Sequence, residues 1–344
     1  MIYICWSYHH ILIAISKVMS QNVHADILLV KNGNALDENI YIKLRNEKIF
    51  NNVYIIDSNK APWGISKKRV LKYLINRYYR LKKYYDGCFP VNLKEYSNIY
   101  TFFDSDSIGA YLNILHLKYH IIEDAKRAYT TSVLKKLSPV ITNQIINPSF
   151  IMSLAQKLNI IIPIFGNSKY CIDIEVDSLE DIYYTKYNKN KFICIEEKTI
   201  FDKLNMYNIN IIMGIFGQEL KLDKNKKYNL ILTEPLYADK RVKDMYQQSK
   251  VYESIVEQIT DDSIILIKPH PRDLCKYERI ENDKIIKLSR TFPSEILTFV
   301  SNEMFENCYT ISSSSILMFE EKKRIDIWAD TANSVEGTQE TVIQ

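Results

Sequence analysis

Residues 2–6 read IYICW, an unbroken apolar run that leads directly into a helical pattern ending at about Met19. Further runs of this kind follow in the first half of the chain, with helical patterns between them, at 25–30, 52–58, 98–104 and 118–124. Continuous apolar strands that alternate with helices are typical of a parallel sheet covered on both faces. We therefore expect a Rossmann-like domain in the first half of the chain.

The alternation of strands and helices weakens between about 126 and 225, where helices are expected only at roughly 130–137, 148–158 and 197–215. It then begins again. The later strands are predicted at 228–235, 263–269, 284–288, 308–314 and 324–330, with helices at 241–259 and after Pro293. This pattern predicts a second Rossmann-like domain, and we divide the chain into 1–185 and 186–344.

Composition limits the class of protein. A chain of 344 residues with 47% hydrophobic and 25% charged residues has enough apolar material for two cores. It has only 8 glycines and no glycine-rich phosphate loop. A net charge of +4 is too small to predict nucleic-acid binding. The 6 cysteines lack paired spacing and no apolar run is long enough to span a membrane, so we expect a cytoplasmic protein.

The turn Lys268-Pro269-His270-Pro271 lies at the end of a predicted strand. Each proline fixes its own φ near about −65° and restricts the residue before it, so the backbone around His270 is rigid. An imidazole with a pKa of about 6.5 can donate a hydrogen bond to a phosphate or supply a proton. A purely structural histidine in a proline-rich turn is the alternative.

Two other predicted strand ends carry polar residues. The serines 312–315 close the strand 308–314, and hydroxyl and N–H groups at a helix N-terminus can bind an anion without glycine. Glu123 and Asp124 close the strand 118–124, where carboxylates can act as a general base or bind acceptor hydroxyls. Capping of a following helix explains either group equally simply.

The loop TEPLYAD at 233–239 follows the first strand of the second half, and Asp239, or failing that Asp244, is its candidate catalytic carboxylate. A surface turn is the alternative. A phosphate cradle in one domain and carboxylates in the cleft are what glycosyl transfer from a nucleotide needs, and no metal is then required. Asp104-Ser105-Asp106, the nearest match to a metal-binding DxD motif, is assigned an acceptor-side or structural role.

A set of motifs occurs in order from about residue 2 to 320: YICWSYHHILIA, FFDSDSIGAY, HIIEDA, FGNSK, ILTEPLYAD, IKPHPRD, FPSEIL and SSSSIL. This set resembles glycosyltransferase family 52, which contains bacterial lipooligosaccharide and capsule α-2,3-sialyltransferases. The resemblance implies an α/β fold of GT-B architecture, with two Rossmann-like domains whose parallel sheets face a central cleft. It also implies that 1–185 form the acceptor-side domain and 186–344 the nucleotide-sugar (CMP) binding domain.

The resemblance implies roles for individual residues. The implied catalytic residues are Asp239 as general base, His270 as general acid or phosphate donor, and the acidic pair Glu123 and Asp124. The residues implied to bind CMP are Lys268, Pro271, Glu295, Ser314 and Ser315, of which the serines contact the phosphate and Glu295 the ribose hydroxyls. Ala125 stands where the family's acidic motif normally ends in glycine, and it would strain a turn that needs positive φ.

The implied reaction is a single inverting displacement without metal or cofactor, in which sialic acid moves from CMP-sialic acid to a galactose-terminated acceptor. A related transferase that uses UDP-hexose or CDP-glycerol, and a non-catalytic binding protein, are the alternatives. A homodimer is also expected, since family members pair through exchanged elements.

The segment 67–85, KKRVLKYLINRYYRLKKYY, has helical spacing and a wide basic face. A solvated face on a helix that packs against the sheet is the simplest explanation. Peripheral contact with anionic lipid at the inner face of the membrane is the functional one, because a lipid-linked acceptor is made there. Nucleic-acid binding lacks any accompanying fold signal.

Overall fold

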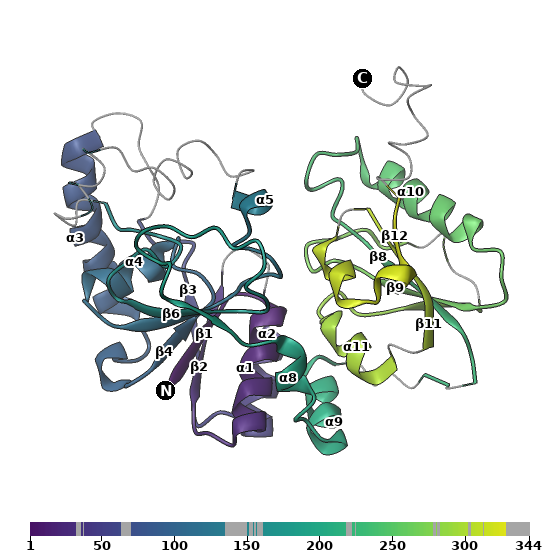
Figure 1. Ribbon diagram of the computed structural model, residues 1–344, viewed down its shortest axis with the longest axis horizontal. Helices are drawn as coiled ribbons and strands as arrows, with labels where there is room; N and C mark the ends of the chain where they lie inside the picture. Colours follow the sequence, from purple (N-terminus) through teal and green to yellow (C-terminus); the bar gives the residue numbers. More distant parts are fainter. Residues whose placement is uncertain are drawn as a thin grey trace. The chain divides into compact units, whose positions relative to one another are not determined.

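The computed structural model describes residues 1–31, 36, 38–62, 70–134, 150, 154, 156, 161–217, 222–223, 225–277, 280, 283–301, 304–311 and 313–327. The chain divides into two compact units, Met1–Ile209 and Asn210–Gln344. Each unit contains one sheet with helices around it (Figure 1).

The sheet of the first unit has the strand order β3-β2-β1-β4-β5-β6-β7, and each neighbouring pair is parallel. Its strands are β1 (Ile2–Cys5), β2 (Asp26–Lys31), β3 (Val53–Asp57), β4 (Ile99–Thr101), β5 (Tyr119–Ile122), β6 (Cys171–Val176) and β7 (Phe192–Cys194). The central β1 is buried along its whole length, as its apolar sequence predicts.

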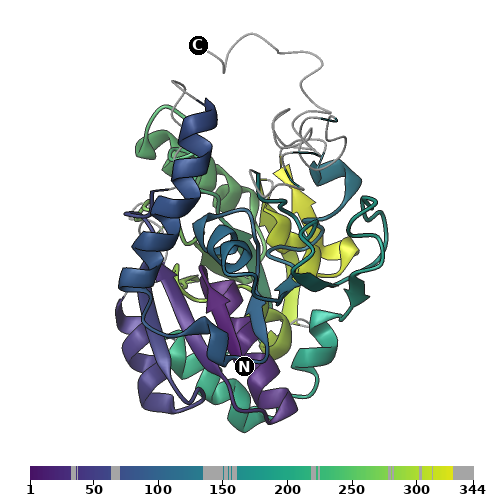
Figure 2. The same ribbon diagram turned by 90° about the vertical axis from the view of Figure 1, so that its left-hand side faces the viewer.

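Helices cover both faces of this sheet. They are α1 (Tyr8–Gln21), α2 (Glu38–Glu47), α3 (Val70–Cys88), α4 (Ser107–Ile114), α5 (Thr131–Leu134), α8 (Glu197–Phe201) and, across the boundary between the units, α9 (Met206–Ile215), with a 3-10 turn η1 (Leu93–Glu95). The helices α3 and α4 lie next to each other over one face, and α1 and α2 lie on the other (Figures 1 and 2). The first helix begins where the Ser7 side chain accepts the N–H of His10, and it ends at Asn22, whose φ is 51°.

The second unit has a parallel sheet with the order β10-β9-β8-β11-β12. Its strands are β8 (Tyr228–Leu232), β9 (Ile264–Lys268), β10 (Ile285–Lys287), β11 (Phe305–Thr310) and β12 (Arg324–Asp326). The helices are α10 (Met245–Gln258) and α11 (Glu295–Ser301), with the 3-10 turns η4 (Ser314–Met318) and η5 (Glu321–Lys323). Among the described helices of either unit, none is both long and apolar enough to cross a membrane.

The structure differs from the sequence prediction mainly between 171 and 215. β6 and β7 were not predicted, because polar residues occupy inward positions of β6: Glu175 pairs with the buried Lys17, and Asp173 pairs with His120. β7 pairs with β6, so the first unit extends past the predicted boundary at 185 to Ile209. The single helix predicted at 197–215 is two helices, α8 and α9.

Other sequence predictions for this region fall partly outside the described residues. Of the helix expected at 130–137 the structure describes α5, and most of the one expected at 148–158 lies beyond the description. The basic helix is present as α3, and its side chains are described from Arg77 onward.

Candidate functional site

Three loops leave the carboxyl edge of the second sheet next to one another. β8 lies between β9 and β11, so the segments after Leu232, Lys268 and Thr310 start side by side. The backbone N–H of Thr233 donates to the carbonyl of Lys268 at 3.1 Å, and Thr310 Oγ1 donates to the carbonyl of Leu232 at 3.4 Å. This edge brings together His270 and the neighbouring polar residues predicted from the sequence.

His270 is held as a neutral imidazole of defined tautomer. Its Nδ1 accepts the backbone N–H of Arg272 at 3.1 Å, and its own backbone N–H donates to Thr233 Oγ1 at 3.2 Å. Burial, together with the positive charges of Arg272 and Lys268, lowers the pKa of His270 to about 4. Because Nδ1 is an acceptor, the ring proton lies on Nε2, and this N–H is the donor that the turn offers to a ligand.

The buried Asp273 holds the turn around His270 in place, a role that the sequence alone did not predict. Its buried carboxylate accepts hydrogen bonds from Thr233 Oγ1, from Tyr277 Oη at 2.6 Å and from Gln248 Nε2 at 2.8 Å. Its backbone N–H donates to the carbonyl of His270 at 2.8 Å. An aspartate three residues after a proline-fixed histidine was the available signal, but its partners lie far away in the sequence.

Asp239 and Asp244, the two candidate bases of this unit, have different partners. Both carboxylate oxygens of Asp239 accept hydrogen bonds from the guanidinium of Arg272, at 2.8 and 3.3 Å. Asp244 caps α10 by accepting the N–H of Gln247 at 2.7 Å. Asp244 thus contacts the start of its own helix, and Asp239 is the partner of an exposed arginine next to His270.

Glu234 joins the loop after β11 to this group. Burial raises the pKa of its carboxyl, and the hydroxyl of Ser313 and the charge of Arg241 partly oppose that rise. Its backbone N–H donates to Tyr252 Oη at 2.6 Å. The edge thus brings together the guanidinium of Arg272, which is paired with Asp239, the charge of Arg241, an imidazole N–H and the hydroxyl of Ser313, which bonds Glu234. Such groups suit a phosphate or a carboxylate ligand.

The other predicted nucleotide-binding residues surround this edge in different ways. Lys268 is buried, and its Nζ donates to the carbonyls of Pro269 and, at 3.2 Å, of Arg290. Burial lowers the pKa of Lys268 to about 8. This amine braces two backbone segments, which is a supporting role beneath the site. Pro271 is half-buried.

Glu295 and the serines lie at the starts of short elements. Glu295 is half-buried at the first position of α11. Its negative charge raises the pKa of Lys268 and so partly opposes the lowering caused by burial. Ser313 caps η4 by accepting the N–H of Ser315 at 3.4 Å. The predicted helix after the serines is therefore a 3-10 turn, and the side chain of Ser314 lies outside the described ones.

In the first unit, Glu123 and Asp124 follow β5 but point into different surroundings. Glu123 is 7% exposed, and its Oε2 accepts the backbone N–H of Asp177 at 3.1 Å. Burial raises the pKa of Glu123 to about 7. Asp124 is half-exposed and its Oδ1 accepts a hydrogen bond from Nε2 of the buried His10. Burial, the largest single effect, raises the pKa of Asp124, but the hydrogen bond from His10 and the charges of His10 and His9 together lower it below its ordinary value.

Asp104 and Asp106 have structural partners. Asp104 accepts the backbone N–H groups of Phe165 at 2.6 Å and Gly166 at 3.1 Å. Asp106 caps α4 and accepts Trp6 Nε1–H at 3.0 Å. The DxD-like sequence therefore organises the loops around β4.

The sequence model of glycosyltransferase family 52 matches residues 65–329, which is most of the chain. The chain belongs to glycosyltransferase family 52. This family 52 chain is also 28% identical, over 172 residues, to an uncharacterized protein of Haemophilus influenzae (strain KW20 / Rd), covering 48% of this chain and 53% of that protein. The chain thus spans about half the length of the curated relative it matches.

Among solved structures, the family 52 chain is similar to proteins of two enzyme classes. For the α/β-galactoside α-2,3-sialyltransferase of Photobacterium phosphoreum, identity is 10%, the TM-score 0.49, and coverage 94% of this chain and 88% of that one. The GT-B domain of a Photobacterium damselae sialyltransferase is 14% identical, with a TM-score of 0.47 and coverage of 94% of this chain and 88% of that one. The UDP-GlcNAc 2-epimerase of Neisseria meningitidis is 11% identical, with a TM-score of 0.48 and coverage of 92% of this chain and 78% of that one. The two parallel α/β units are those expected of a GT-B protein.

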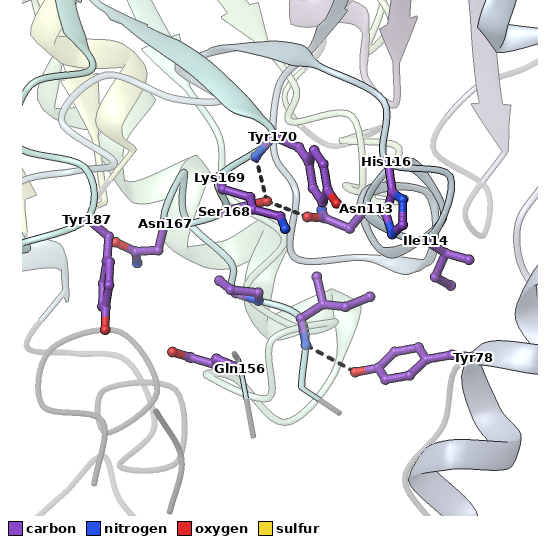
Figure 3. Close-up of a pocket in the computed structure, with 12 residues that line it drawn as sticks. Tyr78, Asn113, Ile114, His116, Gln156, Asn167, Ser168, Lys169, Tyr170 and Tyr187 are labelled. Atoms are coloured by element: carbon purple, nitrogen blue, oxygen red, sulfur yellow. Dashed lines mark hydrogen bonds between the residues drawn. The ribbon is translucent and has the colours of Figure 1, made fainter. Parts of the chain in front are cut away.

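The first unit of this family 52 chain also contains a cavity of about 460 Å³. Its wall includes Asn113 and His116 before β5 and Ser168 before β6, and Tyr78 Oη accepts the N–H of Ile162 at 3.1 Å on another side (Figure 3). These residues precede the strands, whereas the predicted site residues follow them. None of the predicted site residues is among the described residues of the cavity wall.

Proposed function

We infer that this family 52 protein is an inverting glycosyltransferase that transfers sialic acid from CMP-sialic acid to a terminal galactoside of a bacterial surface glycan, lipooligosaccharide or capsule. The observation that carries the proposal is the His270 turn, where a neutral imidazole offers Nε2–H beside the guanidinium of Arg272. That combination suits a phosphate leaving group.

In the proposed reaction, negative charge develops on the phosphate oxygen of CMP as its bond to the sugar breaks. A hydrogen bond from His270 and the positive charge of Arg272 would stabilise that oxygen. A bound phosphate also favours the imidazolium form, so the pKa of His270 rises from about 4 when CMP is present. In this proposal, Ser315 and Ser314 contact the phosphate and Glu295 the ribose.

The acceptor hydroxyl must lose a proton in the same step, and a carboxylate is the proposed recipient. Asp239 has both oxygens engaged by Arg272, and Glu123 is buried against the backbone. Asp124 is half-exposed, is ionised because its pKa is lowered, and is neither paired with a guanidinium nor buried, so we assign the proton to Asp124 on the ground of its access to the acceptor. Asp239 then orients Arg272 toward the donor.

We place the protein at the inner face of the membrane, where lipid-linked acceptors are made. Leu81 and Tyr85 of α3 are buried against the sheet, while Tyr79, Arg80 and Lys83 are exposed. This outward basic face supports peripheral contact with anionic lipid.

A nucleotide panel tests the proposal. The melting temperature of the full chain is measured with equal concentrations of CMP, CDP and UDP, for wild type and for His270→Ala. CMP is expected to stabilise wild type by about 2.7 kcal/mol at 100 times its Kd, and His270→Ala much less at the same concentration. Lys284→Ala, which alters an exposed lysine of the same unit, is the control. Stabilisation by UDP without CMP would contradict the choice of donor.

A further inference from the structure

The imidazole of His10 is fixed in the first turn of α1. The helix begins directly after β1, and Ser7 Oγ accepts the backbone N–H of His10 at 3.2 Å. The Nδ1 of the ring accepts the backbone N–H of Trp6 at 3.1 Å. Both contacts involve residues of the β1–α1 turn, so the ring lies at the carboxyl edge of the first sheet.

Packing restricts the ring further. His10 is 1% exposed, and its ring stacks on that of Phe102 with a centroid distance of 3.9 Å and an interplanar angle of 3°. Phe102 directly follows β4, the neighbour of β1 in the sheet. The plane of the imidazole is therefore set by a contact with the next strand as well as by its own turn.

The tautomer of His10 follows from these contacts. Burial lowers its pKa, so the ring is neutral near pH 7, and Nδ1 is an acceptor. The proton therefore lies on Nε2, where it is donated to Oδ1 of Asp124. A buried and immobile donor thus holds a carboxylate whose side chain is 51% exposed.

The folding of the β1–α1 turn does not require the hydrogen bond from His10 to the half-exposed carboxylate of Asp124. The N–H of Trp6 is satisfied by any acceptor at the position of Nδ1, and the contact with Phe102 needs only a flat ring. The hydrogen bond to Asp124 adds a specific orientation of an exposed group, and no other hydrogen bond of the Asp124 carboxylate is seen among the described residues.

We propose that His10 is a positioning residue that orients Asp124 to accept the proton of the acceptor hydroxyl. The proposal rests on the transfer reaction proposed above and specifies how its acceptor side is built. His10 keeps its Nε2 proton throughout and touches neither sugar.

The step balances within the proposed reaction. The acceptor oxygen forms a bond to the anomeric carbon of the donor, and its proton passes to Oδ2 of Asp124. The bond from that carbon to the phosphate oxygen breaks, and CMP leaves with the electron pair. Because His10 occupies Oδ1, the other oxygen of Asp124 is the one directed to the acceptor.

Two substitutions at His10 separate this role from a structural one. In His10→Asn, the amide oxygen lies near the position of Nδ1, so the contact with Trp6 is retained and the donor to Asp124 is lost. In His10→Gln, the amide nitrogen lies near the position of Nε2, so the donor is retained and the contact with Trp6 is lost. His24→Asn, which alters an exposed histidine, is the control.

The measurement is kcat and KM for the acceptor in sialyl transfer by the full chain, with melting temperatures recorded in parallel. We expect kcat of His10→Asn to fall about 100-fold, and that of His10→Gln to fall about fivefold or less, with KM little changed. In the Asp124→Asn background, His10→Asn should cost nothing further. Retained activity in His10→Asn with loss in His10→Gln would overturn the proposal, because the contact with Trp6 would then be the one that matters.

A second readout needs no substrate. The ¹⁵N chemical shifts of the His10 ring are expected to report a neutral Nε2–H tautomer at pH 7, and Asp124→Asn is expected to shift Nε2 more than Nδ1. An Nδ1–H tautomer would overturn the proposal even in a protein that transfers sialic acid. A wild type that shows the Nε2–H tautomer but transfers nothing contradicts the proposed function instead.

Discussion

The hydroxyl of Thr233 donates to the buried carboxylate of Asp273 while its oxygen accepts the backbone N–H of His270. This relay connects the loop after β8 to the turn after β9. Gln248 of α10 reinforces it by donating to Asp273 at 2.8 Å and accepting the N–H of Tyr237 at 2.8 Å. The orientation of His270 therefore depends on a buried carboxylate that bonds Thr233.

Replacing Asp273 tests this dependence. In wild type, several groups donate hydrogen bonds to the carboxylate of Asp273. In Asp273→Asn, an amide nitrogen replaces one carboxylate oxygen and cannot accept these bonds, so buried hydrogen bonds are lost. We expect the free energy of unfolding to fall by about 3 kcal/mol and the affinity for CMP to fall at least tenfold in the protein that remains folded. Denaturant unfolding and calorimetry measure the two effects. The control Asp262→Asn alters an exposed aspartate and should change neither; equal losses in both variants would contradict the account.

Glu123 predicts a pH-dependent stability of known sign. Its pKa in the folded protein is about 7, above the ordinary value of 4.5, so folding favours its protonated form. The stability contributed by this group is present below pH 4.5 and is lost as the pH rises through 7. Glu123→Gln removes that titration, so the variant should be more stable than wild type at pH 8 by up to about 3 kcal/mol.

The measurement is the melting temperature of both proteins between pH 5 and 9, with Glu47→Gln at an exposed site as control. The advantage of Glu123→Gln should grow with pH, while the control should follow wild type. A difference that stays constant across this range would show that Glu123 does not titrate as described.

Gly109 and Gly87, both in helices of the first unit, differ in the space available for a Cβ and can be compared by substitution with alanine. A Cβ at Gly109 in α4 would lie 2.4 Å from the carbonyl oxygen of Asp104, whereas a Cβ at Gly87 in α3 meets nothing within 4 Å. Gly109→Ala should therefore lower the free energy of unfolding by about 2 kcal/mol or more, through displacement of Asp104. Gly87→Ala should leave it unchanged or raise it by up to about 1 kcal/mol. Thermal unfolding measures both, and a tolerated Gly109→Ala would contradict the close contact between α4 and the loop that follows β4.

The strands built on a continuous apolar stretch could be predicted from the sequence, because residues buried on both faces of a parallel sheet are mainly apolar. β1 is apolar throughout, and β2, β8 and β9 contain the stretches ILLV, LIL and IILI. β6 could not, because its half-buried Glu175 and Asp173 pair with Lys17 and His120, which belong to distant elements. From the sequence alone, a charged residue in a strand is predicted to be exposed, because its partner in the folded protein is not known.

The same limit applies to the site. His270 was recognisable from its position between two prolines at a strand end, a local property. Asp273 and His10 were not, since their roles arise from contacts with Thr233 and Asp124, far away in the sequence. The two histidines in an otherwise apolar N-terminal segment were the available signal for His10.

The most direct test of the central claim is the rate of sialic acid transfer from CMP-sialic acid to a galactose-terminated acceptor, measured for wild type and His270→Ala, with the product identified by mass and its linkage by NMR. We expect wild type to form an α-linked product without added metal. It also predicts a kcat at least 100-fold lower for His270→Ala, with an unchanged fold. Wild-type turnover that survives in His270→Ala with little loss would contradict the account.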